Sequence, residues 1–407
     1  MRTPRLIVLT IIAAALPSLA GAAEVQATSS TQYLWYTDPL SDHKDQGDVA
    51  EYLRVNVSLD QGGQYRAVGY GRVIRQTTTT AESSPDWFGR LYYLFLDGRD
   101  VIKDHLDLRV GRTYVNQAAI PGVVDGGFVD FRNLGIAGLG VTAFGGHRAT
   151  FDDKEDVSKS GDALAGGSVY WNTALQTHLE LSYARKYTDK DLAQEFVALQ
   201  LSTAPLDMLS LLGRASYDVS QSRYSELLLQ ANVSPWKQVI LRGEYYANNP
   251  TFDKYSFYSF FGVTQYQQVS ATLELQLDSR YRLHGSYAYE KFDSTTDANV
   301  FDVGLYLRPL EALVLDIAYE NRSGYAGGLN GIRFHGSYRF GKAAILAGTD
   351  YADFRRDEAR DGTAKRYWVG ASYDFARFLG VILRAEENYS FYFSHAYQGF
   401  VALNVHI

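Results

Sequence analysis

The placement of three of the eight histidines and the absence of cysteine limit the metal and redox chemistry open to this chain. His178, His284 and His335 fall on the same side of alternating segments, but no two of them stand two or four positions apart. A histidine metal site needs such convergence, so we expect solvated side chains and no metal. The cysteine count of 0 excludes disulfides, thiolate ligands and the Cys-x-x-Cys-His attachment of haem. We therefore expect no cofactor on this chain.

Motifs for catalysis and nucleotide binding are also weak. Serine, histidine and aspartate are present, but neither a nucleophile elbow nor an H-E-x-x-H motif occurs. The glycine-rich run 135–140 lacks the helix that a dinucleotide fingerprint must open. The acidic run 152–156 could bind divalent cations or a basic partner, although a solvated loop is the simpler interpretation. We expect no enzyme.

Charged residues of both signs fall on one side of the alternating segments. Such a surface would hydrate a channel or hold a polar partner, but a polar wall with opposite charges paired across strands explains it equally well. Neither sign dominates, so we expect no strong ion selectivity. The predicted lumen-lining residues are Asp107, Arg109, Glu180, Arg242, Glu244, Arg282, Glu290, Asp302, Arg308, Asp316, Glu320, Arg333, Arg339, Arg384 and Glu386.

The composition indicates which elements carry these side chains. The 407 residues include 14% aromatic residues and 36 glycines, but only 9 prolines and 2 methionines. This balance favours an all-β chain. The mean hydropathy of −0.22 excludes a multi-span helical membrane protein. The net charge of −7 offers no basic surface for nucleic acid.

Alternation of apolar and polar residues continues through most of the chain, in segments of about 9 to 12 residues. That length and the aromatic residues near segment ends favour strands that cross a membrane, rather than a secreted β-sandwich array or β-helix. The predicted lipid-facing residues are Leu313, Leu315, Ile317, Phe334, Val401, Leu403 and Val405. Pairs such as Gly145-Gly146 and Gly166-Gly167 would relieve crowding in a curved wall.

Both ends of the chain predict export to an outer membrane. Arg2 and Arg5, the apolar stretch 6–15 and Ala20-Gly21-Ala22 form a secretory signal, so we expect cleavage of residues 1–22. Val401, Leu403, Val405 and Ile407 resemble the final-strand signal read by the barrel assembly machinery, which usually ends in Phe or Trp. We expect an integral protein of a Gram-negative outer membrane, in contact with lipid and lipopolysaccharide.

The segments predict a single transmembrane antiparallel up-and-down β-barrel over residues 23–407, with about 22 strands in the range 18–22. The least secure strand is 126–133. An even number of strands places both termini in the periplasm. A barrel of this size would leave a lumen of roughly 25–30 Å. No segment before the first strand is long enough to form a plug domain, so something else should fill the lumen.

The links predict two different ends of the barrel. Tight turns fall at 235–237, 278–280, 309–311 and 341–342, whereas the links 38–48, 77–85, 149–163, 248–261 and 355–363 are longer and more polar. Loop 116–125, with Ile120, Pro121 and Asp125, occupies the position where porins place their constriction. We expect it to narrow one side of the lumen without closing it.

An unplugged barrel with short loops resembles the barrel subunit of porin–cytochrome conduits. The segments Leu108–Val115 and Pro121–Gly127 also resemble a stretch common in outer-membrane proteins of metal-reducing bacteria. This resemblance implies an electrically insulating sheath around a periplasmic multihaem cytochrome, which would supply the haem and pass electrons to an extracellular cytochrome. It implies no catalysis by the barrel.

Two other classes of function stay open. The chain could be a general or solute-selective porin for passive diffusion, which a strand count of about 16 to 18 with a loop folded inward would favour. It could also be a structural or adhesive barrel. Haem that purifies with the chain would favour the conduit, whereas a haem-free barrel of high conductance would favour the porin.

Overall fold

The computed structural model describes residues 24–38, 44–77, 87–151, 156–157, 160–174, 176–250, 265–293, 296–324, 327–356, 359–390 and 393–407. The predicted signal peptide 1–22, the acidic residues Asp152–Glu155 and parts of the predicted links lie outside these residues. No helix in the described ranges is both long and apolar enough to cross a membrane.

The described chain is built from β-strands. In order they are β1 (Val25–Asp38), β2 (Lys44–Ser58), β3 (Tyr65–Gln76), β4 (Trp87–Ile102), β5 (Leu106–Asn116), β6 (Pro121–Phe131), β7 (Leu139–Arg148), β8 (Thr150–Phe151), β9 (Asp156–Val157), β10 (Ala163–Thr173), β11 (Thr177–Thr188), β12 (Asp191–Leu206), β13 (Leu209–Asp218), β14 (Arg223–Trp236), β15 (Val239–Asn248), β16 (Tyr266–Gln276), β17 (Tyr281–Phe292), β18 (Ala298–Leu310), β19 (Leu313–Gly324), β20 (Gly328–Phe340), β21 (Ala343–Arg356), β22 (Ala359–Ala376), β23 (Leu379–Ser390) and β24 (Phe393–His406).

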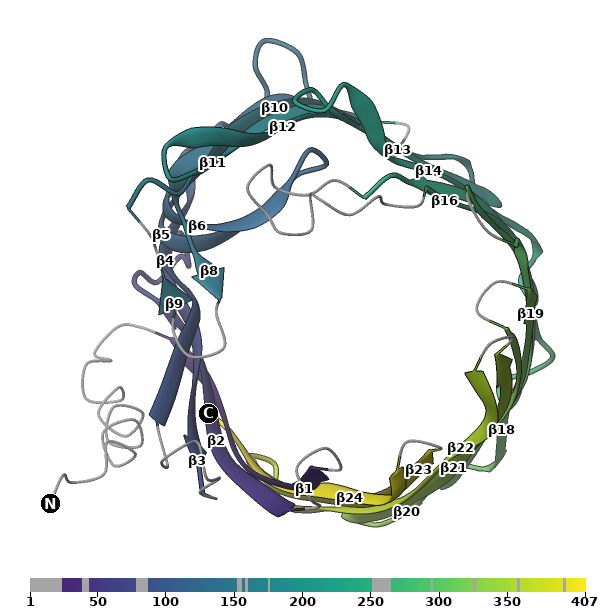
Figure 1. Cartoon of the computed structure of the whole chain (residues 1–407). Helices are drawn as coiled ribbons and strands as arrows, with labels where there is room; N and C mark the ends of the chain where they lie inside the picture. The colour runs from purple at the N-terminus through teal and green to yellow at the C-terminus, as the bar shows by residue number, and fades with distance from the viewer. Residues whose placement is uncertain are drawn as a thin grey trace, which may run out of the picture.

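These strands close into one 22-stranded antiparallel barrel (Figure 1). Each strand of the wall pairs with its neighbours along the chain, β7 pairs with β10, and Thr28–Tyr36 of β1 pairs with Gln398–His406 of β24. The two-residue strands β8 and β9 form a separate pair on the inner side of the wall. The predicted class and strand number are confirmed, including the strand expected at 126–133, which is β6.

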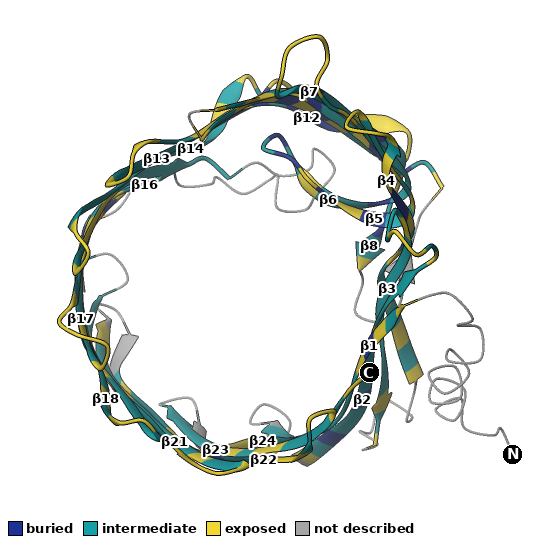
Figure 2. Ribbon diagram, turned by 180° about the vertical axis from the view of Figure 1, so that it is seen from behind, coloured by how far each residue is buried: buried dark blue, intermediate teal, exposed yellow. Residues whose placement is uncertain are grey.

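The two faces of the wall differ because side chains alternate along every strand. Ile317, Phe334 and Leu403 are 37%, 39% and 41% exposed on the outer face, as expected for side chains that meet acyl chains. Buried residues instead gather around β5, β6, β7 and β10–β12, where a second layer covers the wall (Figure 2).

The turns at one end of the barrel are tight, as predicted. Only residues 237–238, 311–312 and 341–342 separate the strands there, and both ends of the described chain lie at this end. At the opposite end, two predicted links are shorter than expected. β1 and β2 extend to Asp38 and Lys44, and only residues 357–358 separate β21 from β22. These polar strand extensions lack the apolar alternation that marks a membrane strand, so the sequence pattern missed them.

Arginine at Leu315 tests the assignment of the outer face. Leu315 lies opposite Leu307 and Gly336 on neighbouring strands, between the ends of the apolar band. We expect Leu315→Arg to lower the free energy of unfolding in lipid vesicles by about 2–4 kcal/mol, because a charge must then face acyl chains.

The matched control is Val314→Arg, one position away on the inner face. Urea titration of the folded fraction in vesicles measures both variants. A Leu315→Arg variant as stable as Val314→Arg would show that the two faces are wrongly assigned.

Candidate functional site: the barrel lumen

The hairpin formed by β5 and β6 bends into the lumen, as its tip in Figure 1 shows. Pairing of β5 with β4 ends at Arg112, and pairing of β6 with β7 ends at Val124. Beyond these points the hairpin lies over the inner face of β7 and β10–β12. Val115 and Val124 are almost fully buried there, against Leu164 of β10 and other apolar side chains of the wall.

Glycines allow this close approach of two backbones. A Cβ atom on Gly126 would lie 2.1 Å from the carbonyl oxygen of Gly145, and one on Gly146 would lie 2.5 Å from that of Asp125. Gly111 has a φ of +127°, which disfavours any other residue. The glycine pairs that the sequence places in this sector therefore let the sheet fold back on itself.

Hydrogen bonds hold the tip of the hairpin against the wall. The side-chain amide of Gln117 donates to the hydroxyl oxygens of Thr142 and Ser168. The backbone N–H of Ala119 donates to Ser182 Oγ over 2.9 Å. Together with the apolar contacts, these bonds make the tip a fixed part of the inner wall.

The predicted constriction loop is thus present but shorter than expected. Only residues 117–120 separate β5 from β6, so Ile120 lies in the turn and Pro121 begins β6. Ile120 packs against the buried cluster. Asp125 lies within β6, on the face opposite Val124, and accepts hydrogen bonds from Arg112 over 2.7 and 2.8 Å. It is not part of the turn that enters the lumen, because the hairpin pairing continues past it to Pro121 and Asn116.

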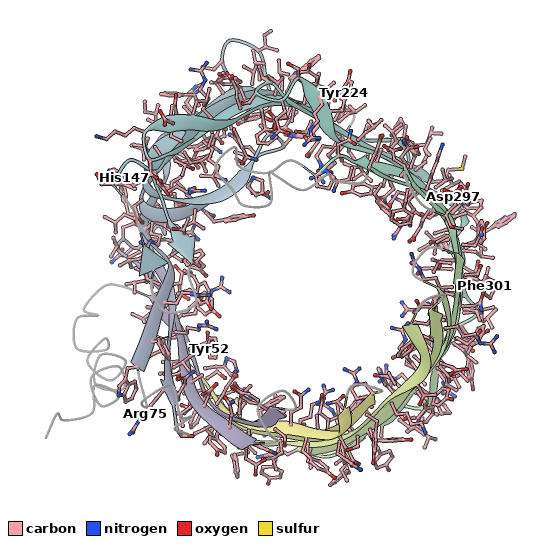
Figure 3. All side chains as sticks on the ribbon, viewed as in Figure 1. Tyr52, Arg75, His147, Tyr224, Asp297 and Phe301 are labelled. Atoms are coloured by element: carbon pink, nitrogen blue, oxygen red, sulfur yellow. The ribbon has the colours of Figure 1, made fainter. Side chains whose placement is uncertain are left out.

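The packed hairpin also identifies the inner face of every strand. Ser182 contacts the hairpin, so its side of β11 faces inward, and the strand register carries this assignment around the barrel. Figure 3 shows Tyr52 on the inner side of the wall and Phe301 on the outer side. The register places all the predicted lumen-lining residues, from Asp107 and Arg109 to Glu386, on the inner face and the predicted lipid-facing residues on the outer face. Contact of the outer face with lipid, and of the inner face with a solute or a partner protein, stays a prediction.

Two aspartates on the inner face of β17–β22 each contact one histidine and one arginine. Asp302 lies 3.0 Å from His284 Nε2 and 3.7 Å from Arg333. Asp350 lies 2.9 Å from His335 Nε2 and accepts a hydrogen bond of 2.6 Å from Arg366 Nε. These contacts join opposite charges from different strands of this half of the wall.

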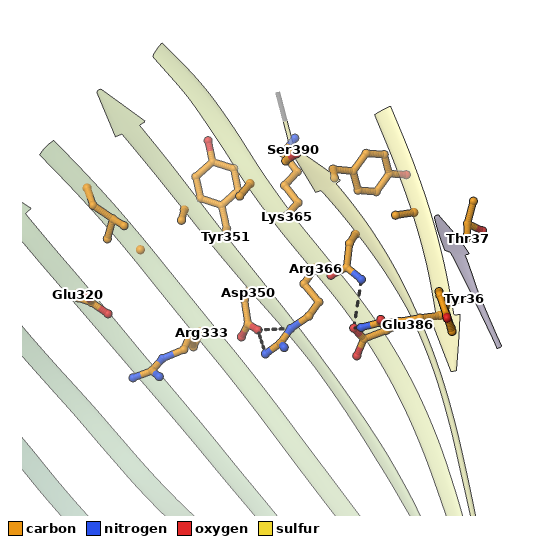
Figure 4. A pocket seen from close by; sticks show the side chains of 18 residues that line it. Tyr36, Thr37, Glu320, Arg333, Asp350, Tyr351, Lys365, Arg366, Glu386 and Ser390 are labelled. Atoms are coloured by element: carbon orange, nitrogen blue, oxygen red, sulfur yellow. Dashed lines mark hydrogen bonds and ion pairs between the residues drawn. The ribbon is translucent and has the colours of Figure 1, made fainter. Parts of the chain in front are cut away.

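The same pattern continues on both sides of these residues. Glu290 pairs with Arg322 over 2.5 Å and Glu386 with Arg384 over 2.9 Å. Figure 4 shows the Asp350–Arg366 pair beside Glu386, in a hollow of the wall of about 720 Å³. The alternation of charges, predicted from the sequence, is therefore a series of local ion pairs.

Asp97 on β4 is the most buried carboxylate of an ion pair network on the opposite side of the lumen. Its side chain is 6% exposed and lies 2.5 Å from Arg66, 3.1 Å from Arg99 and 3.5 Å from Arg109. One buried carboxylate thus serves three arginines, and Asp107 and Asp130 line the same hollow of the wall as Arg109. The sequence pattern does not reveal Asp97, because the alternation of apolar and polar residues along β4 is interrupted where Tyr92 bulges from the strand.

No cluster of potential metal ligands occurs in the described ranges. His178 lies 3.5 Å from Glu180, and the other two wall histidines each contact one aspartate. Each of these three histidines thus has a carboxylate as a neighbour in the wall.

Comparisons with known proteins find likeness only among solved structures. The outer membrane protein OpdK of Pseudomonas aeruginosa is 12% identical, with 94% of this chain and 99% of that chain covered and a TM-score of 0.48. OccAB3 of Acinetobacter baumannii is 9% identical, with 94% and 99% covered and a TM-score of 0.49. A structure of OpdK with vanillate is 10% identical, with 95% and 98% covered and a TM-score of 0.47. No family model and no curated protein matches the chain.

Proposed function

We propose that this chain is an outer-membrane channel for passive diffusion of small polar solutes. The observation that supports it best is the β5–β6 hairpin, whose tip is fixed inside a lumen that the other described residues leave unfilled. Val115 and Val124 anchor the hairpin, and Ser182 and Thr142 hold its turn. A rigid segment on one side of a wide bore narrows the passage and keeps it open.

The charges of the wall fit such a channel. Asp302 and Asp350 each contact a histidine and an arginine, so the β17–β24 half of the inner wall is polar and carries local ion pairs. Solutes would meet a hydrated surface with weak overall preference for either sign of charge. The proposal assigns no catalytic step and no cofactor to this chain.

An alternative function is an insulating sheath for electron transfer. The width of the bore supports it, because the described side chains line the wall and do not meet across the centre. A periplasmic multihaem cytochrome would then fill the lumen, supply the haem and pass electrons to an extracellular cytochrome. The fixed hairpin favours the channel, since a sheath gains nothing from a segment that occupies part of the space its partner needs.

Both functions place the chain in the outer membrane of a Gram-negative bacterium, with both termini in the periplasm. The outer face would contact lipid and lipopolysaccharide, and the final strand, which ends at His406, would present the signal for the barrel assembly machinery. These assignments belong to the proposal.

Purification of the native protein from outer membranes separates the two functions. We expect a barrel without haem absorbance that gives stable, high-conductance channels in planar bilayers. Haem that stays bound in stoichiometric amount through gel filtration, with low conductance of the intact complex, would favour the sheath and contradict the channel.

A thiol placed on the hairpin tests whether it lines the passage. The chain has no native cysteine, so Asn116→Cys would carry the only thiol. Asn116 is exposed on the hairpin face opposite the buried Val115. We expect labelling with a bulky polar thiol reagent to lower single-channel conductance.

The control is Val219→Cys, in the link between β13 and β14, where the native side chain is 39% exposed. Labelling there should leave the conductance unchanged. Equal conductance of the labelled and unlabelled Asn116→Cys channels would show that the hairpin does not narrow the passage.

A further inference from the structure

A row of aromatic side chains runs along the inner wall on the side where Asp97 is found. Phe95 and Tyr93 of β4 have ring centroids 5.8 Å apart, and Tyr93 lies 5.7 Å from Tyr70 of β3. Tyr70 stacks on Tyr92 with centroids 4.8 Å apart and an interplanar angle of 18°. Tyr92 in turn lies 5.9 Å from Phe151 of β8. The rings follow β4 from Phe95 toward the end of the barrel opposite the chain termini.

A break in strand register creates this row. Tyr70 pairs with Tyr93, whereas the next residue, Gly71, pairs with Leu91, so Tyr92 is an extra residue in β4. A bulge of this kind places two neighbouring side chains on one face of a strand. Tyr92 and Tyr93 therefore both face the lumen, while Leu91 and Leu94 are exposed on the outer face.

Arginines accompany the rings along the whole row. Arg109 lies with its Cζ atom 4.7 Å from the centroid of Phe95 and 5.5 Å from that of Phe128. Arg72 lies 5.9 Å from the Tyr92 centroid and Arg90 lies 5.5 Å from the Phe151 centroid. Arg109 also pairs with Asp97 over 3.5 Å. A guanidinium group beside an aromatic face, such as that of Arg72, can still bind an oxyanion through its N–H groups.

Two arginines of this sector lack an ion-pair partner among the described residues: Arg72 of β3, and Arg54 of β2, which stands directly opposite Tyr70. Arg72 and Arg90 stand directly opposite each other on β3 and β4, a pairing of like charges that costs stability. Within the described ranges, no carboxylate lies within ion-pair distance of Arg54 or Arg72. By contrast, the arginines Arg322, Arg366 and Arg384 of the other half each contact a carboxylate.

The phenol groups of the row also lack partners among the described residues. The hydroxyls of Tyr52, Tyr70, Tyr92 and Tyr93 make no hydrogen bond there. Three other tyrosines of the inner wall do donate hydrogen bonds. Tyr36 donates to Gln46 over 3.0 Å, Tyr170 to Asp130 over 2.7 Å, and Tyr266 to Gln268 over 2.6 Å. The row therefore combines flat apolar faces, cations and several free hydroxyls.

We propose that this row, from Phe95 to Tyr92 with Arg72 and the adjacent Arg54, is a binding track for anionic carbohydrates on their way through the lumen. The inference rests on the proposed channel function and names its substrate class. The apolar face of a sugar ring packs on an aromatic side chain, and the arginines bind the carboxylate or phosphate of the sugar. The phenol hydroxyls hydrogen-bond to sugar hydroxyls.

A flat aromatic acid fits the row less well. It would use the rings and the arginines, but it would leave the hydroxyls of Tyr52, Tyr70, Tyr92 and Tyr93 without partners. A neutral sugar would leave Arg54 and Arg72 without an anion. Only a ligand with both hydroxyls and negative charge uses all the groups that the wall presents.

Current block in planar bilayers tests the track. The probes are trigalacturonate, the neutral trisaccharide maltotriose and benzoate, each added to the purified full-length protein. We expect trigalacturonate to interrupt the current at lower concentrations than either of the others.

Three variants locate the site. Arg72→Gln should weaken the block by trigalacturonate about tenfold, the loss typical of one charged hydrogen bond. Tyr92→Phe keeps the ring and removes the hydroxyl, and should weaken it about fivefold. The control is Arg282→Gln on the opposite wall, where Arg282 lies 5.3 Å from the Tyr306 ring in an isolated pair. Trigalacturonate should block the current through this variant at the same concentrations as it blocks the unmodified channel.

The outcomes distinguish a failure of the proposed binding track from a failure of the proposed channel function. If the unmodified protein conducts but trigalacturonate blocks no better than maltotriose or benzoate, the track is wrong and the channel stands. If Arg282→Gln weakens the block as much as Arg72→Gln, the site is not this row. If the folded protein gives no conductance, the proposed channel function fails. Heat-modifiable electrophoretic mobility verifies that each variant has folded.

Discussion

For the membrane location that we propose, backbone hydrogen bonding in a medium without water is the constraint on which this structure depends. Every N–H and C=O group that faces lipid must be paired within the protein, so a membrane sheet has to close on itself. Pairing of Thr28–Tyr36 with Gln398–His406 provides that closure. Closure at 22 strands then fixes the width of the barrel, because neighbouring strands lie about 4.8 Å apart. Side chains cannot fill a bore of this width, so among the described residues the lumen is narrowed where the β5–β6 hairpin folds inward.

The β5–β6 hairpin supplies that inward fold, and it divides the lumen into unequal parts. On its side, glycines and small residues let two layers of strand pack, and Val124 and Leu164 are almost fully buried. Next to it lies the sector of aromatic and arginine side chains around Tyr92. The remaining half of the wall is polar and carries local ion pairs such as the one between Glu290 and Arg322. The inner wall thus presents a packed hairpin, a sector of aromatic and arginine side chains, and a polar surface with local ion pairs.

Much of the wall could be predicted from the sequence, because alternation with a period of two determines both the strands and their faces. The pattern around Leu313, Leu315 and Ile317 specifies one face, and the pairing of neighbouring strands carries that choice around the barrel. Strand ends were less predictable. Outside the membrane a strand no longer needs an apolar face, so the extensions near Asp38 and Lys44 gave no signal.

The lumen was less predictable than the wall. The position of the inward loop followed from its place in the order of strands, but its contacts depend on residues distant in sequence. Gln117 reaches Ser168, and Ala119 reaches Ser182. Asp97 and the aromatic row depend on the extra residue in β4, which moves Tyr92 and Tyr93 to one face and breaks the alternation that the sequence analysis relied on.

Neutral polymer exclusion in planar bilayers measures the bore directly. Polyethylene glycols that enter a channel lower its conductance, and larger ones that are excluded do not. A wide barrel narrowed on one side predicts that polymers with a hydrodynamic diameter of about 20 Å still enter. A cut-off below about 10 Å would mean that the protein closes its own lumen, and it would contradict an open passage as well as a space wide enough for a second protein.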